Sequence, residues 1–292
     1  MTDTSHDRYR DLQRLARAGG RPADELMTLY ALEGFLARLV TTRYRDTFVL
    51  KGGMLLAALD TRRPTRDIDV QALDFDNDID HVLEVVGDVL AVDLDDGLTF
   101  DLGSVTVEQI RDDDDYHGVR VAIAAALATA RLKLKLDISI GDPITPRPED
   151  VDLPRLLDGP SIRMPGLPLP MVLAEKTVTA LERGTANTRW RDFADVLLLS
   201  RVHDVDGDET ARAVAAVSQH RGAELRPLAE VLDGFAEQAQ DRWWRWVRKF
   251  RLDDRLPEPF AEVLAAVQAF ADPVIAGEVS GRRWVAAEER WR

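Results

Sequence analysis

The sequence contains no cysteine among its 292 residues. Disulfide bonds, thiolate zinc sites and a cysteine nucleophile are therefore excluded, and this composition is typical of a reducing compartment. The five histidines show no spacing typical of metal ligands. Carboxylates are thus the only side chains that we expect to bind a metal ion.

Long apolar segments are missing as well. No apolar run is long enough to span a bilayer, and residues 1–8 lack the hydrophobic core of a signal peptide. We therefore expect a soluble, cytoplasmic protein that makes no membrane contact. The chain is long enough for two modest domains.

Basic residues are outnumbered by acidic ones, 38 to 52, and the formal net charge is −14. Phosphate backbones are attracted by basic surfaces, so this charge argues against RNA binding. Acidic runs at 74–80, 93–96 and 112–115 contribute to it, and we interpret them as solvated turns. An RNA partner would need a local basic patch.

The segment 48–59 combines a short apolar run, two glycines and a helix-forming run. It predicts a strand, a tight turn and the start of a helix. Such a turn lets backbone N–H groups approach a triphosphate closely. We assign Lys51, Gly52 and Gly53 to nucleotide binding, although two glycines after a strand often form only a turn.

Asp67 and Asp69 follow, with Ile68 and Val70 beside them. The apolar residues indicate a strand, which places both carboxylates on one face. One or two protein carboxylates plus substrate phosphates form a typical Mg²⁺ site. An Asp-x-Asp pair can be coincidental in so acidic a chain, but its position after the glycine turn indicates nucleotidyl transfer.

The segment 132–140 alternates between apolar and polar residues, as a strand does. Asp137 lies on its polar face together with Lys133 and Lys135. A third carboxylate beside an Asp-x-Asp pair would suit a two-metal transferase. The alternative is that Asp137 only faces solvent, and Asp142 is a competing third ligand.

The order of elements predicts two regions. A flexible polar start at 1–20, helices at 22–44 and 78–92, and strands at 105–110, 119–127 and 132–140 predict a mixed sheet domain. Eight prolines in 143–170 indicate a connector. Helical periodicity then predicts helices at 169–183, 190–203, 209–220, 225–238, 241–251 and 259–270. We expect an α/β (α+β) fold with a sheet domain over 1–160 and a mostly helical domain over 161–292.

The glycine turn followed by Asp-Ile-Asp resembles the pattern of the DNA polymerase β-like nucleotidyltransferase superfamily. The strings 50–53 and 64–69 are more narrowly similar to the AbiEii/MenT group, which are toxins of toxin–antitoxin systems. This resemblance implies an NTP substrate, two Mg²⁺ ions and a cognate antitoxin. It also implies an acidic third metal ligand, for which it favours Asp137.

The resemblance further implies a lysine early in the helix after the sheet domain and then an Asp-x-x-Asp element. Lys176 and the string 191–196 match these positions, with Val196 where leucine is usual. On the residues alone, a helical lysine is most often solvated. By resemblance, Lys176 neutralises the triphosphate and Asp192 holds or deprotonates groups around the acceptor. Asp195 could be a structural companion, and Arg189 and Arg191 could pair with these acids or contact phosphate.

Thr65 and Arg66 lie directly before the Asp-x-Asp pair, and we add both to the nucleotide-binding residues. A threonine at such a place usually serves as a turn or cap hydroxyl. In the resembling toxins, a hydroxyl at this position can be phosphorylated by the antitoxin. A phosphate on Thr65 would add about −1.5 to −2 charges and obstruct triphosphate binding.

The segment 241–251 is strongly basic and aromatic. As a helix it would place an apolar stripe on one side, formed by Trp243, Trp246, Val247 and Phe250. The other side would carry the candidate RNA-binding residues Trp244, Arg245, Arg248 and Arg251. We interpret the stripe itself as core packing, and the tail at 282–292 is a weaker RNA candidate.

By resemblance, the function is transfer of a nucleoside monophosphate from an NTP, with CTP or another pyrimidine nucleotide favoured, to the 3′ end of tRNA. Such a change would block aminoacylation and growth. Two alternatives remain: a transferase that modifies protein hydroxyls or a small molecule, and an inactive nucleotide-binding module. Neither the acceptor nor the base follows from the residues themselves.

Overall fold

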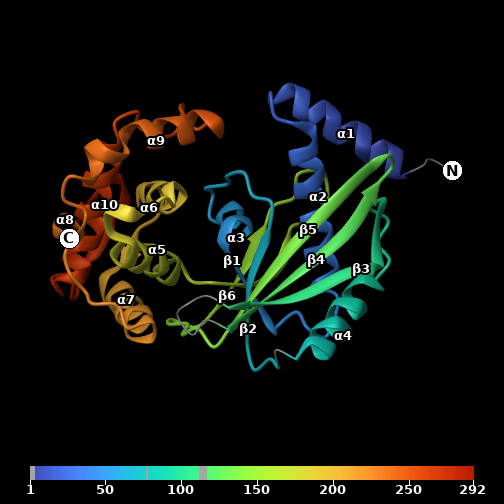
Figure 1. The fold of residues 1–292 in the computed structure, drawn as a ribbon, viewed down its shortest axis with the longest axis horizontal. Helices are drawn as coiled ribbons and strands as arrows, with labels where there is room; N and C mark the ends of the chain where they lie inside the picture. Colours follow the sequence, from blue (N-terminus) through green and yellow to red (C-terminus); the bar gives the residue numbers. More distant parts are fainter. Residues whose placement is uncertain (1–3, 77, 112–116) are drawn as a thin grey trace. The chain divides into compact units, whose positions relative to one another are not determined.

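The protein is described by a computed structural model that covers residues 4–76, 78–111 and 117–292. It divides into two compact units (Figure 1). The sheet unit comprises Met1–Asp142 and Glu149–Gly166, and the helical unit comprises Pro143–Pro148 and Leu167–Arg292. Within the described ranges, no helix is long and apolar enough to cross a membrane.

A seven-stranded mixed sheet forms the centre of the sheet unit, with the strand order β3-β4-β5-β2-β1-β7-β6. Strands β1 and β7, and β2 and β5, run parallel, whereas the other neighbours run antiparallel. The mixed α/β class predicted from the sequence is confirmed. The strands are β1 Phe48–Lys51, β2 Ile68–Ala72, β3 Leu98–Arg111, β4 His117–Leu127, β5 Ala130–Ile140, β6 Glu149–Leu153 and β7 Ile162–Gly166.

Strand β5 alternates as expected. Leu132, Leu134, Leu136 and Ile138 are buried, whereas Asp137 on the opposite face is partly exposed. Ala128 and Thr129 connect β4 to β5 in a tight hairpin, in which Leu127 pairs with Ala130. This short connection fixes the register of the whole β4–β5 pair.

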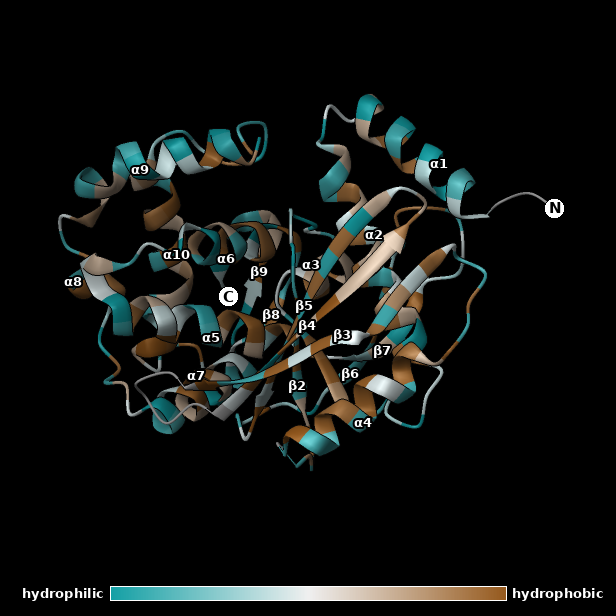
Figure 2. Cartoon of the chain, turned by 45° about the vertical axis from the view of Figure 1, so that its right-hand side comes forward, coloured by the Kyte–Doolittle hydropathy of each residue, from teal (hydrophilic) through white to brown (hydrophobic). Residues whose placement is uncertain are grey.

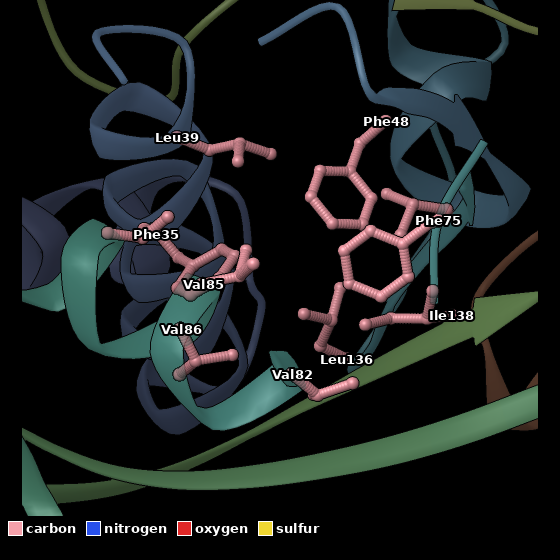
Figure 3. A pocket seen from close by; sticks show the side chains of 11 residues that line it. Phe35, Leu39, Phe48, Phe75, Val82, Val85, Val86, Leu136 and Ile138 are labelled. Carbon is pink, nitrogen blue, oxygen red and sulfur yellow. The ribbon is translucent and has the colours of Figure 1, made fainter. Parts of the chain in front are cut away.

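Helices α2 (Ala23–Leu39) and α4 (Ile79–Leu90) cover the apolar face of the sheet. Their side chains and those of β2 and β5 point toward a small pocket, shown in Figure 3, whose lining is entirely apolar. Val70, Leu136 and Ile138 contribute to this lining, and they alternate with the carboxylate residues along their strands. The pocket is therefore part of the core and lies on the face away from Asp69 and Asp137.

Three expectations for the sheet unit were wrong. Helix α1 (Thr4–Ala18) occupies the start that was expected to be flexible, and it buries Leu12 and Ala16. Asp96, expected in a solvated turn, is buried and accepts two hydrogen bonds from Arg38. The acidic run 112–115 lies outside the described residues.

The third correction concerns the proline-rich connector, because β6 and β7 form within it. Seven of its eight prolines lie outside both strands. Pro165 lies inside β7, but the pairing of β7 with β1 joins Gly166 to Leu50 at the very end of the strand. On the other side of β7, Pro165 is the register partner of Asp150 in β6.

The helical unit confirms most of the expected helices. One expected boundary was wrong. We expected helices at 225–238 and 241–251, but the structure has a short helix α8 and then one continuous helix α9 that runs through 239–240. Helix α9 begins after Gly234, which has a φ of 69°. The elements are α5 Leu169–Arg183, α6 Trp190–Val202, α7 Gly207–Arg221, α8 Leu228–Val231, α9 Phe235–Lys249 and α10 Phe260–Ile275, with the short strands β8 Val205–Asp206, β9 Arg283–Val285 and β10 Arg290–Trp291.

Aromatic side chains build the core of the helical unit. Phe260 packs edge-on against Trp190, Phe193 and Phe235, and Trp243 lies against the same ring. All six tryptophans of the chain belong to this unit, whereas all four tyrosines fall within the range of the sheet unit. Figure 2 shows hydrophilic and hydrophobic residues interleaved along α9, as in an amphipathic helix.

Candidate active site

The glycine turn lies where β1 ends at Lys51 and helix α3 (Gly52–Ala58) begins. Gly52 has a φ of 61°, which favours glycine. A Cβ at Gly52 would overlap the Asp69 carboxylate, and one at Gly53 would lie 2.5 Å from Thr65 Oγ1. Both glycines are therefore required, because the side chains of Asp69 and Thr65 pack directly against the turn.

Four charged residues form a row across four adjacent strands. Lys51 pairs with Asp69 between β1 and β2, Asp69 pairs with Asp137 between β2 and β5, and Asp137 pairs with Arg120 between β5 and β4. Direct cross-strand partners project from the same face of a sheet. We name Lys51, Asp69, Asp137 and Arg120 the charged row. Asp67 lies in the bend directly before β2, and its negative charge acts on Arg120 at the end of the row.

Each carboxylate near the charged row has a partner. The Thr65 hydroxyl donates to Asp67 Oδ1 at 3.0 Å, and Lys51 Nζ lies 3.2 Å from Asp142 Oδ2. Arg120 donates through Nε and Nη2 to the two oxygens of Asp137, at 2.7 Å each. Hydrogen bonding and charge attraction from Asp137, with smaller contributions from Asp67 and Glu108, raise the pKa of Arg120 despite its partial burial.

The donor chemistry of Asp67 and Asp69 fits a hard cation such as Mg²⁺, which needs only one or two protein carboxylates when phosphates complete its shell. In the described part of the chain, no group of three or more His, Cys, Asp or Glu side chains is arranged to hold a metal ion. Arg120 engages both oxygens of Asp137, and Lys51 lies beside Asp142. Both candidates for the third ligand thus have a cationic partner.

A second cluster of charges lies in the helical unit. Lys176 Nζ on α5 lies 3.2 Å from Asp192 Oδ1 and 2.7 Å from Asp195 Oδ2, both on α6. Arg189 Nε lies 2.8 Å from Asp192 Oδ2, although the two atoms do not align as a hydrogen bond. We name Lys176, Arg189, Asp192 and Asp195 the lysine cluster. The side chains of Asp192 and Asp195 are only 5% and 1% exposed.

Asp192 is held in its ionised form. Burial alone would raise its pKa, but the charges of Lys176, Arg189 and Arg191 outweigh burial, so that the pKa is lowered from its ordinary value. A carboxylate with a lowered pKa is a weak base. Its site therefore favours an electrostatic or positioning role over proton abstraction.

Comparison with known proteins identifies the chain. The model of a family described as nucleotidyl transferase AbiEii toxin of type IV toxin–antitoxin systems matches residues 34–268. The chain belongs to the AbiEii family. The matched range contains both the charged row and the lysine cluster, and this AbiEii protein is a nucleotidyltransferase. No curated protein matches the sequence significantly.

Solved structures from Helicobacter pylori are similar to this AbiEii protein. The structure of JHP933 is 16% identical, with a TM-score of 0.48, over 86% of this chain and 92% of that chain. A candidate nucleotidyltransferase from the same bacterium is 16% identical, with a TM-score of 0.47, over 88% of this chain and 96% of that chain.

Several residues of the AbiEii protein were not anticipated from the sequence. The tight β4–β5 hairpin pairs Leu127 with Ala130, and the same register pairs Arg120 with Asp137 farther along the two strands. Arg120 could have been found only with the position of this hairpin known. Arg63 belongs to the surroundings of the glycine turn, because its Nη1 lies 3.4 Å from where a Cβ of Gly53 would be. Arg66 itself is exposed. Asn187 is 1% exposed, its Nδ2 has no hydrogen-bond partner among the described residues, and no motif indicated it.

Helix α9 carries the predicted apolar stripe and most of the candidate RNA-binding residues. Trp243 and Val247 are fully buried, but Phe250, expected in the stripe, is 36% exposed just beyond the helix end. Trp244 is partly exposed. The candidate arginines Arg245, Arg248 and Arg251 are all exposed.

Proposed function

We propose that this AbiEii nucleotidyltransferase moves a nucleoside monophosphate from an NTP to the 3′ end of tRNA, with CTP or another pyrimidine nucleotide preferred. The observation that carries this proposal is the position of Asp69, in the charged row and directly against the glycine turn. A carboxylate in that position would hold the cation that accompanies a triphosphate bound at the turn. Modification of the tRNA end in the cytoplasm would then block aminoacylation.

The reaction forms one bond and breaks one. The 3′ hydroxyl oxygen bonds to the α-phosphorus, the bond from that phosphorus to the oxygen bridging the β-phosphate breaks, and pyrophosphate leaves with the electron pair. The hydroxyl proton passes to a water molecule as the new bond forms.

Asp67 and Asp69, with Asp137 as third carboxylate, are the residues that would hold Mg²⁺. When bound, this ion neutralises triphosphate charge and polarises the reacting oxygens. Lys51, Gly52, Gly53 and Arg66 would then contact the nucleotide from the sheet unit.

Lys176 would add a further positive charge for the triphosphate. In the lysine cluster it is already paired with two carboxylates, so the phosphate must compete with Asp192 and Asp195 for its ammonium group. Asp192 would then be left to orient the acceptor.

The family implies a cognate antitoxin. We propose Thr65 as the residue through which a phosphorylating antitoxin would act, because its hydroxyl already contacts Asp67. Thr65 is 6% exposed, so the loop that carries it would have to open before modification. A phosphate there would repel the triphosphate.

The test is incubation of the purified protein with Mg²⁺, total tRNA and each labelled NTP in turn. We expect pyrophosphate release and label at the 3′ end of tRNA, strongest with CTP, and neither with Asp69→Asn. Because the net charge of −14 argues against RNA binding, protein and small-molecule acceptors are the second candidate. Label in protein would favour that alternative, and absence of pyrophosphate release would favour an inactive module.

The proposed tRNA surface is the exposed part of α9 and the residues after it. Replacement of Arg245, Arg248 and Arg251 by alanine should weaken tRNA binding. The slope of its salt dependence should fall by about one unit for each arginine that binds a phosphate. NTP binding should be unchanged. Wild-type affinity and slope in the triple variant would move the acceptor surface elsewhere.

A further inference from the structure

Arg120 occupies both oxygens of a carboxylate that the proposed reaction would need for a cation. The distances are 2.7 Å each, from Nε and Nη2, and they match the two-pronged geometry in which a guanidinium binds carboxylates or phosphates. Arg120 and Asp137 are also direct cross-strand partners. The interaction is therefore built into the register of the β4–β5 hairpin and does not depend on one long side chain reaching across the surface.

The exposure of this pair distinguishes it from a structural ion pair in the same unit. The side chains of Arg38 and Asp96 are 3% and 8% exposed, and Arg38 also donates to the backbone oxygens of Gly34 and Val92. The side chains of Arg120 and Asp137 are 43% and 23% exposed. A pair open to water gains little net stability and can change partners, whereas a buried pair cannot do so cheaply.

We propose that Arg120 is a positioning residue that withholds Asp137 from divalent cations until a triphosphate binds. In the nucleotide-free protein the guanidinium neutralises Asp137. A bound triphosphate offers Arg120 an alternative anion, and the released carboxylate then faces the cation that accompanies the phosphates. This inference rests on the proposed nucleotidyl transfer and deepens it.

The charges of the row support this coupling. Lys51 and Arg120 stand at its two ends, with Asp69 and Asp137 between them and Asp67 in the bend directly before β2. Removal of Arg120 would leave the carboxylates of Asp67, Asp69 and Asp137 with Lys51 as the single remaining cation of the charged row. Cation affinity without nucleotide should therefore rise. If a bound triphosphate strengthens cation binding by a certain factor, thermodynamic linkage requires that a bound cation strengthens triphosphate binding by the same factor.

The test measures Mn²⁺ binding to the full chain by electron paramagnetic resonance, with and without a non-hydrolysable CTP analogue and without tRNA. In the absence of nucleotide, Arg120→Gln should bind Mn²⁺ about tenfold more tightly than wild type, a typical size for coupling between sites. The analogue should tighten Mn²⁺ binding strongly in wild type and much less in Arg120→Gln.

Arg131→Gln is the matched control. Arg131 is exposed on β5, on the same face as Asp137, and six residues of strand place it roughly 20 Å away. The control removes the same charge and should leave Mn²⁺ affinity nearly unchanged. Adding Asp137→Asn to Arg120→Gln should return the affinity to the wild-type level, because the released ligand is then absent.

Equal Mn²⁺ affinity of wild type and Arg120→Gln would overturn the inference. Equal increases of Mn²⁺ affinity in Arg120→Gln and Arg131→Gln would also overturn it, because they would indicate a general charge effect. A third contrary outcome is an increase of Mn²⁺ affinity in Arg120→Gln that remains when Asp137→Asn is added. Failure of the proposed transfer would show itself differently, as absence of analogue binding or of labelled tRNA, while the nucleotide-free Mn²⁺ measurements would still decide the role of Arg120. Circular dichroism of each variant verifies its fold.

Discussion

The charged row and the lysine cluster use the same side-chain types in different surroundings. In the lysine cluster the side chains of Asp192, Asp195 and Lys176 are 5%, 1% and 13% exposed. In the charged row, Asp137 and Arg120 are 23% and 43% exposed, whereas Lys51 is only 11% exposed. Removing one partner of a buried ion pair leaves an uncompensated charge, whereas a pair in water is worth little. The lysine cluster should therefore bear on stability, and the Arg120–Asp137 pair of the charged row on ligand binding.

The largest expected effect tests stability in the lysine cluster. Asp195→Ala removes the nearer carboxylate partner of the buried Lys176, and the free energy of unfolding should fall by about 3–5 kcal/mol. Asp137→Ala should cost less than about 1 kcal/mol, because its partner Arg120 is well exposed. Denaturant unfolding followed by circular dichroism measures both. Equal decreases in the two variants would break the comparison.

The next effect tests activity in the charged row. Asp69→Asn should lower kcat/KM for pyrophosphate release by about 10²–10³-fold, which is typical for removal of a charge that stabilises the transition state. Its unfolding free energy should change by less than about 1 kcal/mol. Asp80→Asn, at an exposed position of α4, removes the same charge and serves as the control. Near-normal turnover of Asp69→Asn would remove the metal assignment.

A smaller effect tests the packing of Asp69 against the glycine turn. Gly52→Ala and Gly222→Ala both place alanine at a positive φ, 61° and 63°, but only Gly52 has a side chain against it. Each should lose about 1 kcal/mol of stability through backbone strain, and Gly52→Ala roughly a further 1–3 kcal/mol through overlap. Activity should fall only in Gly52→Ala, because Asp69 is displaced. Equal activity in the two variants would contradict this role for the turn.

The smallest effect concerns pH. The pKa of Asp192 is lowered in the folded protein from its ordinary value of 3.8, so its charge stabilises the fold above that value. This contribution disappears as the pH falls below 3.8 and through the folded pKa. Asp192→Asn should thus lower the free energy of unfolding near neutral pH. Denaturant unfolding at decreasing pH should show the difference in unfolding free energy from wild type becoming smaller in acid. If the difference in unfolding free energy between the two proteins stays constant or widens in acid, the charge of Asp192 does not stabilise the fold.

Local patterns predicted much of this fold because they report on single elements. The alternation of β5 and the bounds of α5 follow from apolar periodicity, and the glycine turn follows from two adjacent glycines. Helix α1 was missed because it buries only Leu12 and Ala16, too few apolar residues for a clear period. Strands β6 and β7 were missed because the surrounding prolines indicated a linker.

The site was predictable in its residue types and less so in its pairings. The placement of Asp69 and Asp137 on one face follows from alternation, and the register agrees, whereas Asp67 lies in the bend before β2. That Arg120 engages Asp137 depends on strand pairing, which the composition of either strand does not specify. Asn187 and Arg63 belong to loops, where no periodicity indicates which side chain turns inward.

The distribution of aromatic residues gives the protein built-in optical reporters. The tryptophans belong to the helical unit and the tyrosines to the sheet unit, so light absorbed by tryptophan alone reports on one unit. Tryptophan fluorescence therefore follows the helical unit on its own, without an attached dye.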